Sequence, residues 1–207
     1  MSSALLVGTA LPARAQTAPT PTSGPCLTPA QKKVNDAYYA LTRPTSHDDE
    51  MPFFDPEYFA GTWDFISRAV DSPLGPGGES AGTLTIASAG GCKYQGEMKG
   101  EDPDGKAFTR KIAFEFDGTK KEITWTETDS RGYAFTTRGP VGGELGGLFH
   151  YHFDTVTPAK TGGKTIGLKG VFEMSSPAYF KIDYQTSTDG GPSANFGRAT
   201  FEKKLTK

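Results

Sequence analysis

The sequence predicts an all-β protein, an antiparallel up-and-down barrel of about 8 to 10 strands with a short N-terminal helix. From Trp63 onward, apolar and polar residues alternate with a period of two, as half-buried strands require. Gly-rich and Asp-Gly turn signals separate these runs at a spacing of roughly 8 to 15 residues. Hairpins that follow one another favour a closed barrel, because closure leaves no exposed sheet edge.

The composition agrees with this fold class. The 207 residues suffice for one domain with a substantial core. The 26 Gly and 15 Pro are high for a helical protein, whereas the 14 Phe and 8 Tyr suit strands. The formal net charge is −2 without a basic patch, so we expect no nucleic-acid partner. No apolar run approaches the roughly 20 residues of a membrane helix, and we expect no transmembrane segment.

The first residues look like a targeting signal. Ala4 to Leu11 is a short, mostly apolar run, and Ala13-Arg14-Ala15 has the small-x-small form of a secretory cleavage site. We therefore predict a signal peptide over residues 1–15 and a periplasmic or secreted protein. Met1-Ser2-Ser3 lacks the usual positive charge, which a start further upstream would explain; the alternative is a disordered tail. Residues 16–27 are rich in Thr, Pro and Ser and predict a flexible linker.

A helical segment is expected over residues 28–58, before a barrel domain over residues 59–207. Thr28 can cap a helix in which Pro29 takes the first position, and Gln31 can complete a capping box. Apolar residues then recur at helical spacing at Val34, Tyr38 and Leu41. Pro44 ends this helix, and Asp55-Pro56-Glu57 predicts the cap of one more helical turn.

The chain has two cysteines, Cys26 and Cys92. In an oxidising compartment they can form one disulfide, which would stabilise the fold by roughly 4 kcal/mol in the chain-entropy model. The alternative is that Cys92 is a small core residue and Cys26 a free thiol.

Arg110 is the strongest candidate for ligand contact. It shares one face of a predicted strand with aromatic and aliphatic residues, at Phe108, Ile112, Phe114 and Phe116. If this face lines the barrel, the guanidinium needs an anionic partner, and a ligand carboxylate would serve. The expected ligand-binding set combines Arg110 with aromatic residues of three predicted strands, at Phe108, Phe114, Trp125 and Tyr151. Alternatively, Arg110 reaches solvent near the strand end or pairs with an internal Glu or Asp.

Two patterns raise metal binding or catalysis and are weaker. His150 and His152 share one strand face with Asp154, a spacing that can supply metal ligands. The opposite face carries Phe149, Tyr151 and Phe153 and is the better core candidate, so we predict no metal site. The string Gly78 to Gly82 places Ser80 in a Gly-x-Ser-x-Gly pattern, but a strand follows it, not the helix of a nucleophile elbow. We therefore predict no catalytic residue.

Gly61-Thr62-Trp63, at the head of the first strand, resembles the Gly-x-Trp opening of the lipocalin and fatty-acid-binding-protein superfamily. The resemblance implies a lipocalin-like barrel in which Trp63 packs at the closed end and Arg198 stacks over it, both structural. More narrowly, the region from Phe59 onward resembles the bacterial lipocalin-like domain-of-unknown-function family 1579, a calycin-like barrel. The shared features are the Gly-x-Trp opening and three turn-rich stretches, at Gly75-Pro76-Gly77-Gly78, Asp102-Pro103-Asp104-Gly105 and Asp129-Ser130-Arg131-Gly132. This family carries no established activity to transfer.

The sequence thus favours an exported barrel that binds a small apolar or amphipathic ligand and uses no cofactor. A drug-sized ligand would need a cavity of a few hundred Å³. One alternative is a non-catalytic scaffold or interaction protein, in which the N-terminal helix or the aromatic segment from Met51 to Phe59 covers the barrel mouth or meets a partner. The least favoured alternative is a metal-dependent enzyme using His150 and His152.

Overall fold

The computed structural model describes residues 26–40, 53–144 and 148–204. The predicted signal peptide and the linker up to residue 25 lie outside this part of the chain. The helices and strands are α1 (Pro29–Ala40), the 3-10 helix η1 (Pro56–Phe59), β1 (Gly61–Ala69), β2 (Gly78–Gly90), β3 (Lys93–Glu101), β4 (Ala107–Asp117), β5 (Glu122–Asp129), β6 (Tyr133–Glu144), β7 (Leu148–Thr157), β8 (Ala159–Thr161), β9 (Lys164–Ser176), β10 (Tyr179–Thr188) and β11 (Ala194–Lys203).

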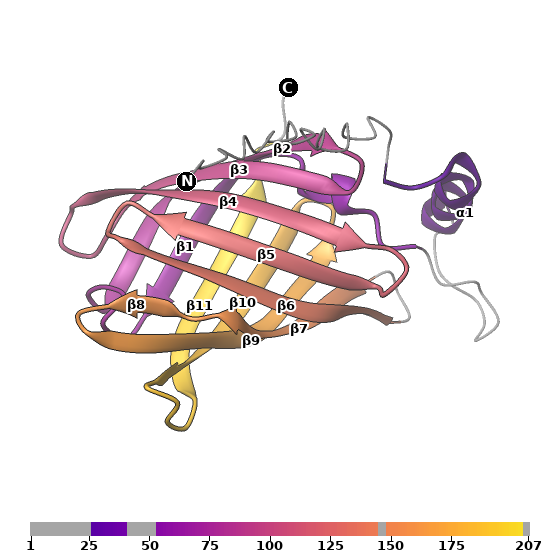
Figure 1. The fold of residues 1–207 in the computed structure, drawn as a ribbon. Coiled ribbons are helices and arrows are strands. Elements are labelled where there is room, and N and C mark those ends of the chain that lie inside the picture. The colour runs from indigo at the N-terminus through magenta and orange to yellow at the C-terminus, as the bar shows by residue number, and fades with distance from the viewer. Residues whose placement is uncertain (1–25, 41–52, 145–147, 205–207) are drawn as a thin grey trace, which may run out of the picture.

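Ten of the described strands close into an antiparallel barrel, shown in Figure 1. From β1 to β7 each strand pairs with the next in sequence, and β9, β10 and β11 continue the order back to β1. The short β8 pairs with β9 alongside the barrel strands. The predicted all-β, up-and-down barrel is therefore confirmed.

The interior is filled by the apolar face of the alternating strands. Large side chains from widely separated strands are almost fully buried there, including Trp63, Tyr94, Phe172, Phe180 and Phe201. Tight turns connect the strands where glycine tolerates positive φ: Gly90, the last residue of β2, and Gly91, in the turn to β3, have φ values of 97° and 61°. The period-two pattern in the sequence thus corresponds to the inside and outside of the barrel.

An aromatic plug formed by Phe54 and Phe59 fills one end of the barrel. Asp55 caps η1 by accepting a hydrogen bond from the Glu57 amide at 3.0 Å, and Pro56 opens the turn. The Phe59 ring is 0 % exposed and contacts rings of β4, β9 and β10, at Phe114, Phe172 and Phe180. Phe54 meets Phe116 and Phe149 edge-on. In its described part, the aromatic segment before β1 therefore covers a barrel mouth.

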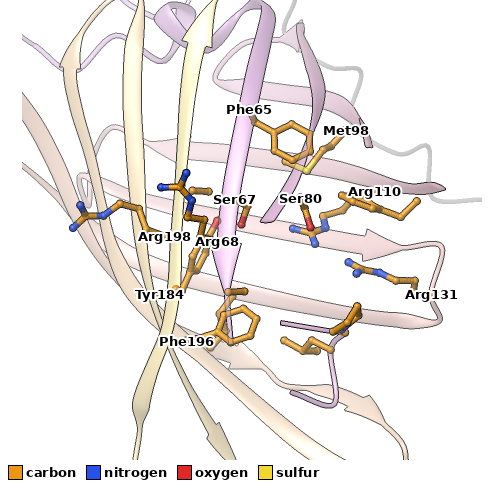
Figure 2. A pocket seen from close by; sticks show the side chains of 18 of the residues that line it. Phe65, Ser67, Arg68, Ser80, Met98, Arg110, Arg131, Tyr184, Phe196 and Arg198 are labelled. Atoms are coloured by element: carbon orange, nitrogen blue, oxygen red, sulfur yellow. The ribbon is translucent and has the colours of Figure 1, made fainter. Parts of the chain in front are cut away.

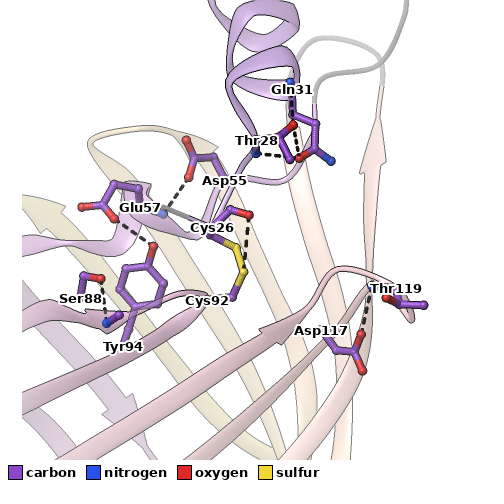
Figure 3. Close-up of a disulfide and its surroundings, with 11 residues drawn as sticks. Cys26, Thr28, Gln31, Asp55, Glu57, Ser88, Cys92, Tyr94, Asp117 and Thr119 are labelled. Atoms are coloured by element: carbon purple, nitrogen blue, oxygen red, sulfur yellow. Dashed lines mark hydrogen bonds between the residues drawn. A yellow bond between two sulfur atoms is a disulfide. The ribbon is translucent and has the colours of Figure 1, made fainter. Parts of the chain in front are cut away.

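The N-terminal helix is tied to this plugged end, as Figure 3 shows. Cys26 and Cys92 form the disulfide, with an S–S distance of 1.98 Å, which joins the start of the described chain to the β2–β3 turn. The predicted capping box is present: the Gln31 amide donates to Thr28 Oγ1 at 3.2 Å, and the Thr28 amide donates to Gln31 Oε1 at 2.9 Å. The predicted end of the helix at Pro44 lies outside the described residues. None of the described helices is long and apolar enough to cross a membrane.

The expected stacking of Arg198 over Trp63 is wrong. Trp63 is buried and donates from Nε1 to the Phe59 carbonyl at 2.9 Å, but the cation over its ring is Lys203, whose Nζ lies 5.1 Å from the ring centroid. Lys203 is the direct cross-strand partner of Trp63. Arg198 lies an odd number of positions earlier on β11, so its side chain points out of the barrel, where it bonds Asp183 at 2.6 Å.

Candidate functional site at the open end of the barrel

A pocket of about 80 Å³ lies inside the barrel at the end opposite the aromatic plug. Figure 2 shows the side chains that line it. The β1–β2 loop folds partly over it and buries the side chain of Leu74. Its apolar wall comes from several strands and includes Phe65, Met98, Phe108 and Leu168. Arg110, Arg131, Tyr133 and Tyr184 contribute polar groups, as do Ser67 and Ser80. The pocket therefore combines an apolar wall with a polar one.

Arg110 points into the barrel, as the alternation on β4 predicts, but its charge is matched from within. Its Nε donates to Asp129 Oδ2 at 3.1 Å, and its Nη1 lies 2.9 Å from Glu127 Oε2. Its Nη2 donates to the Tyr133 hydroxyl at 3.2 Å. The register of β4 against β5 places Arg110 directly opposite Asp129. Arg110 therefore pairs with internal carboxylates, which is one of the alternatives considered for it. Its charge does not require a ligand carboxylate as a partner.

Arg131 completes this cluster from the turn between β5 and β6. Its Nε and Nη2 donate to the two oxygens of Asp129, at 2.9 and 2.7 Å. Its guanidinium also lies over the Phe108 ring, 4.6 Å from the centroid. Within the described part of the chain, Arg131 Nη1 makes no hydrogen bond, and it lies beside Gly75 of the β1–β2 loop. Arg131 therefore offers one unused donor at the mouth of the pocket.

The cluster is electrically balanced, since two guanidinium groups face the carboxylates of Glu127 and Asp129. Burial raises the pKa of Asp129, but the Arg131 hydrogen bond and the charge of Arg110 outweigh it and lower this pKa to about 2. Burial raises the pKa of Tyr133 to about 12, and burial together with the Glu127 charge raises that of Tyr184 well above its ordinary value. Both phenols are therefore uncharged at neutral pH, and no charge in the cluster is left over for a ligand.

The five predicted ligand-contact residues separate into two groups. Arg110 and Phe108 line the pocket. Phe114, Trp125 and Tyr151 lie deeper: the Phe114 and Trp125 rings stack with centroids 5.2 Å apart. Trp125 and Tyr151 border a second cavity of about 10 Å³, which is roughly the space of one water molecule. These three side chains are part of the core packing.

Glu127, Asp129, Arg131, Ser67 and Tyr184 belong to the site but are missing from the predicted set. The period-two alternation of Ile123 and Trp125 continues to Glu127 and Asp129, so the sequence did contain a signal that placed both carboxylates inside. Arg131 sits on a turn, where no periodicity applies. Its place in the cluster depends on the tertiary fold.

His150 and His152 lie on the face of β7 opposite the buried Tyr151, with ring centroids 6.0 Å apart. No group of three or more His, Cys, Asp or Glu side chains that could hold a metal ion occurs among the described residues. Ser80 lies within β2, directly opposite Ser67 of β1, and not on a strand-to-helix turn. This geometry differs from that of a hydrolase nucleophile elbow.

Together, the fold and the site define an antiparallel β-barrel with one plugged end and one end that opens into a small interior pocket. Its structural neighbours are β-barrels. Rv2717c from M. tuberculosis has a TM-score of 0.59 and 13% identity, with 72% of this chain and 94% of that chain covered. A de novo designed fluorescence-activating β-barrel has a TM-score of 0.42 and 17% identity, covering 72% of this chain and 95% of the design. A redesigned barrel, mFAP1 bound to DFHBI, has a TM-score of 0.41 and 15% identity, covering 72% and 96% of the two chains.

At 13% identity the likeness to Rv2717c shows the fold alone. No protein-family model and no curated protein matches the chain.

Proposed function

We propose that this chain is an exported binding protein whose barrel holds a small amphipathic molecule in the pocket beneath the β1–β2 loop. The observation that carries the proposal is the contrast between the two barrel ends. Phe54 and Phe59 are buried in one end of the barrel, whereas the other end keeps a pocket with an apolar wall and a polar wall. Such a combination is typical of sites that bury the apolar part of a ligand and orient its polar part.

The size of the pocket limits the ligand. At about 80 Å³ it is well below the few hundred Å³ that a drug-sized ligand occupies. A fatty acid enclosed along its length is therefore not supported, and the carboxylate that would accompany it has no charge to meet at Arg110. The proposal is restricted to a small, slender molecule whose apolar part packs against the apolar wall while its polar group meets the polar wall.

Export and family membership are part of the same proposal. The signal-like N-terminus supports export, and the Cys26–Cys92 disulfide agrees with an oxidising compartment. The Gly61-Thr62-Trp63 opening supports membership of the lipocalin-like family 1579. This family has no established activity that could be assigned to the chain.

Binding can be tested with n-hexanol, n-hexanoate and n-hexylamine, using ligand-observed NMR on the full chain. Ser67→Phe would fill the pocket from β1, whereas Ile66→Phe adds the same ring to the outer face of the same strand, where Ile66 is 47 % exposed. We expect saturable binding of at least one probe to the wild type and to Ile66→Phe, and its loss in Ser67→Phe. Binding that Ser67→Phe leaves unchanged would place the probe elsewhere and contradict the proposal.

The second candidate is a scaffold without a ligand. The observation that favours it is the same balanced cluster, because buried ion pairs can serve to fix strand register in place of binding. Absence of binding by all three probes, with the protein folded, would favour this alternative.

A further inference from the structure

We infer that the pocket selects an uncharged ligand carrying a hydroxyl or amide group, which is recognised by the paired hydroxyls of Ser67 and Ser80. This inference rests on the proposed binding function and specifies its ligand class. It differs from the sequence-based expectation, in which Arg110 receives a ligand carboxylate.

The register of β1 against β2 makes Ser67 and Ser80 direct cross-strand partners, which places their Cβ atoms about 5 Å apart. Both lie at inward positions, in line with Phe65 on β1 and Leu84 on β2, and both line the pocket, as Figure 2 shows. Within the described part of the chain, neither hydroxyl makes a hydrogen bond. Each can therefore donate to a ligand and accept from it.

The carboxylates of Glu127 and Asp129 are held by Arg110 and Arg131, so the charged groups of the pocket compensate one another. A charged ligand group would give up its hydration without finding an unmatched opposite charge. An uncharged polar group loses far less hydration free energy on leaving water. Hydrogen bonds with the two serines can offset that loss.

Tyr184 borders the pocket from β10. Its phenol stays uncharged at neutral pH, because burial and the nearby Glu127 charge raise its pKa. Among the described residues its hydroxyl makes no hydrogen bond. Among the described lining residues, the hydroxyls of Ser67, Ser80 and Tyr184 are thus neutral groups without a hydrogen bond, and Arg131 Nη1 is a cationic donor beside them. Arg68 and Arg198 also border the pocket, but they pair with Glu79 and Asp183.

The test compares matched probes on the wild type by NMR titration. We use n-hexanol, its isomer methyl pentyl ether, which accepts but cannot donate, and the charged analogues n-hexanoate and n-hexylamine. We expect n-hexanol to bind about tenfold more tightly than each of the other three, the effect of roughly one well-placed hydrogen bond. The double variant Ser67→Ala, Ser80→Ala should remove this preference. Thr85→Ala, which removes an exposed hydroxyl from β2, should retain it.

The possible failures can be told apart. Tighter binding of n-hexanoate than of n-hexanol in the pocket would overturn the inference and assign recognition to Arg131, while the proposed binding function would stand. An unchanged n-hexanol preference in the double serine variant would also overturn it. If none of the four probes perturbs the pocket in the folded wild type, the proposed function itself fails.

Discussion

Arg110 and Asp129 face each other across β4 and β5 inside the barrel, with Arg110 Nε 3.1 Å from Asp129 Oδ2. The Asp129 side chain is fully buried and also accepts hydrogen bonds from the Arg131 side chain and amide. One carboxylate thus orients the guanidinium groups of Arg110 and Arg131 and fixes the β5–β6 turn. The polar wall of the pocket depends on this residue.

Replacing Asp129 by Asn should destabilise the protein by about 3 kcal/mol at neutral pH, because the partly buried guanidinium groups of Arg110 and Arg131 lose the fully buried carboxylate that they share. Urea unfolding of both proteins measures the difference. Asp129→Asn keeps the shape of the side chain, so a loss below about 1 kcal/mol would contradict the role assigned to the carboxylate.

The same carboxylate predicts a pH dependence of stability. The folded-state pKa of Asp129 is about 2, below the ordinary value of about 3.9. Its contribution is therefore complete above about pH 5 and is lost as the pH falls toward 2. Between these limits the free energy of unfolding should fall more in the wild type than in Asp129→Asn. Parallel pH profiles would contradict the assigned pKa shift.

Reducing the Cys26–Cys92 disulfide should lower the free energy of unfolding by about 4 kcal/mol, since it spans 66 residues of sequence. Thermal unfolding with and without dithiothreitol measures this effect. The double variant Cys26→Ser, Cys92→Ser should have the stability of the reduced wild type, and dithiothreitol should not change it. A wild-type protein that is insensitive to reductant would indicate that the cysteines are not joined in solution.

Truncating the plug at Phe59→Ala should cost about 3 to 5 kcal/mol, because this ring is completely buried among other aromatic rings. Val70→Ala is a suitable control, because Val70 is 55 % exposed and should change stability by no more than about 0.5 kcal/mol. Chemical denaturation distinguishes the two. Equal stability of both variants would mean that η1 does not close the barrel.

The two cations of β11 should differ in their contributions. Lys203→Met removes a cation over Trp63 and the hydrogen bond from Nζ to the Tyr58 carbonyl, with an expected cost of about 1 to 2 kcal/mol. Arg198→Met removes an exposed ion pair with Asp183 and should cost less than about 1 kcal/mol. A larger loss of stability for Arg198→Met than for Lys203→Met in urea unfolding would contradict the assignment of Lys203 as the cation over Trp63.

Much of the fold follows from local sequence, because alternation decides which residues of a strand point inward. This placed Phe108 and Arg110 on the interior face of β4 correctly. The same rule, continued from Trp125, also puts Glu127 inside. What sequence alone could not provide was strand register, which pairs Arg110 with Asp129 and Trp63 with Lys203.

The extent of the pocket could not be predicted from the sequence either. Leu74 comes from a loop, and its burial over the barrel mouth depends on tertiary packing that no periodicity encodes. Phe114 and Trp125 are aromatic residues of the kind that often line ligand pockets, yet neighbouring rings occupy the space around them. Interior position therefore does not by itself identify a binding residue.

We propose that the open end of the barrel binds a small amphipathic molecule. The most direct test is a titration of the isotope-labelled chain with n-hexanol, followed by amide NMR shifts. We predict saturable shifts at Ser67, Ser80 and Tyr184, with Phe59 and Trp63 at the plugged end unchanged. Shifts confined to the plugged end or to the outer face, or no shifts at all, would contradict it.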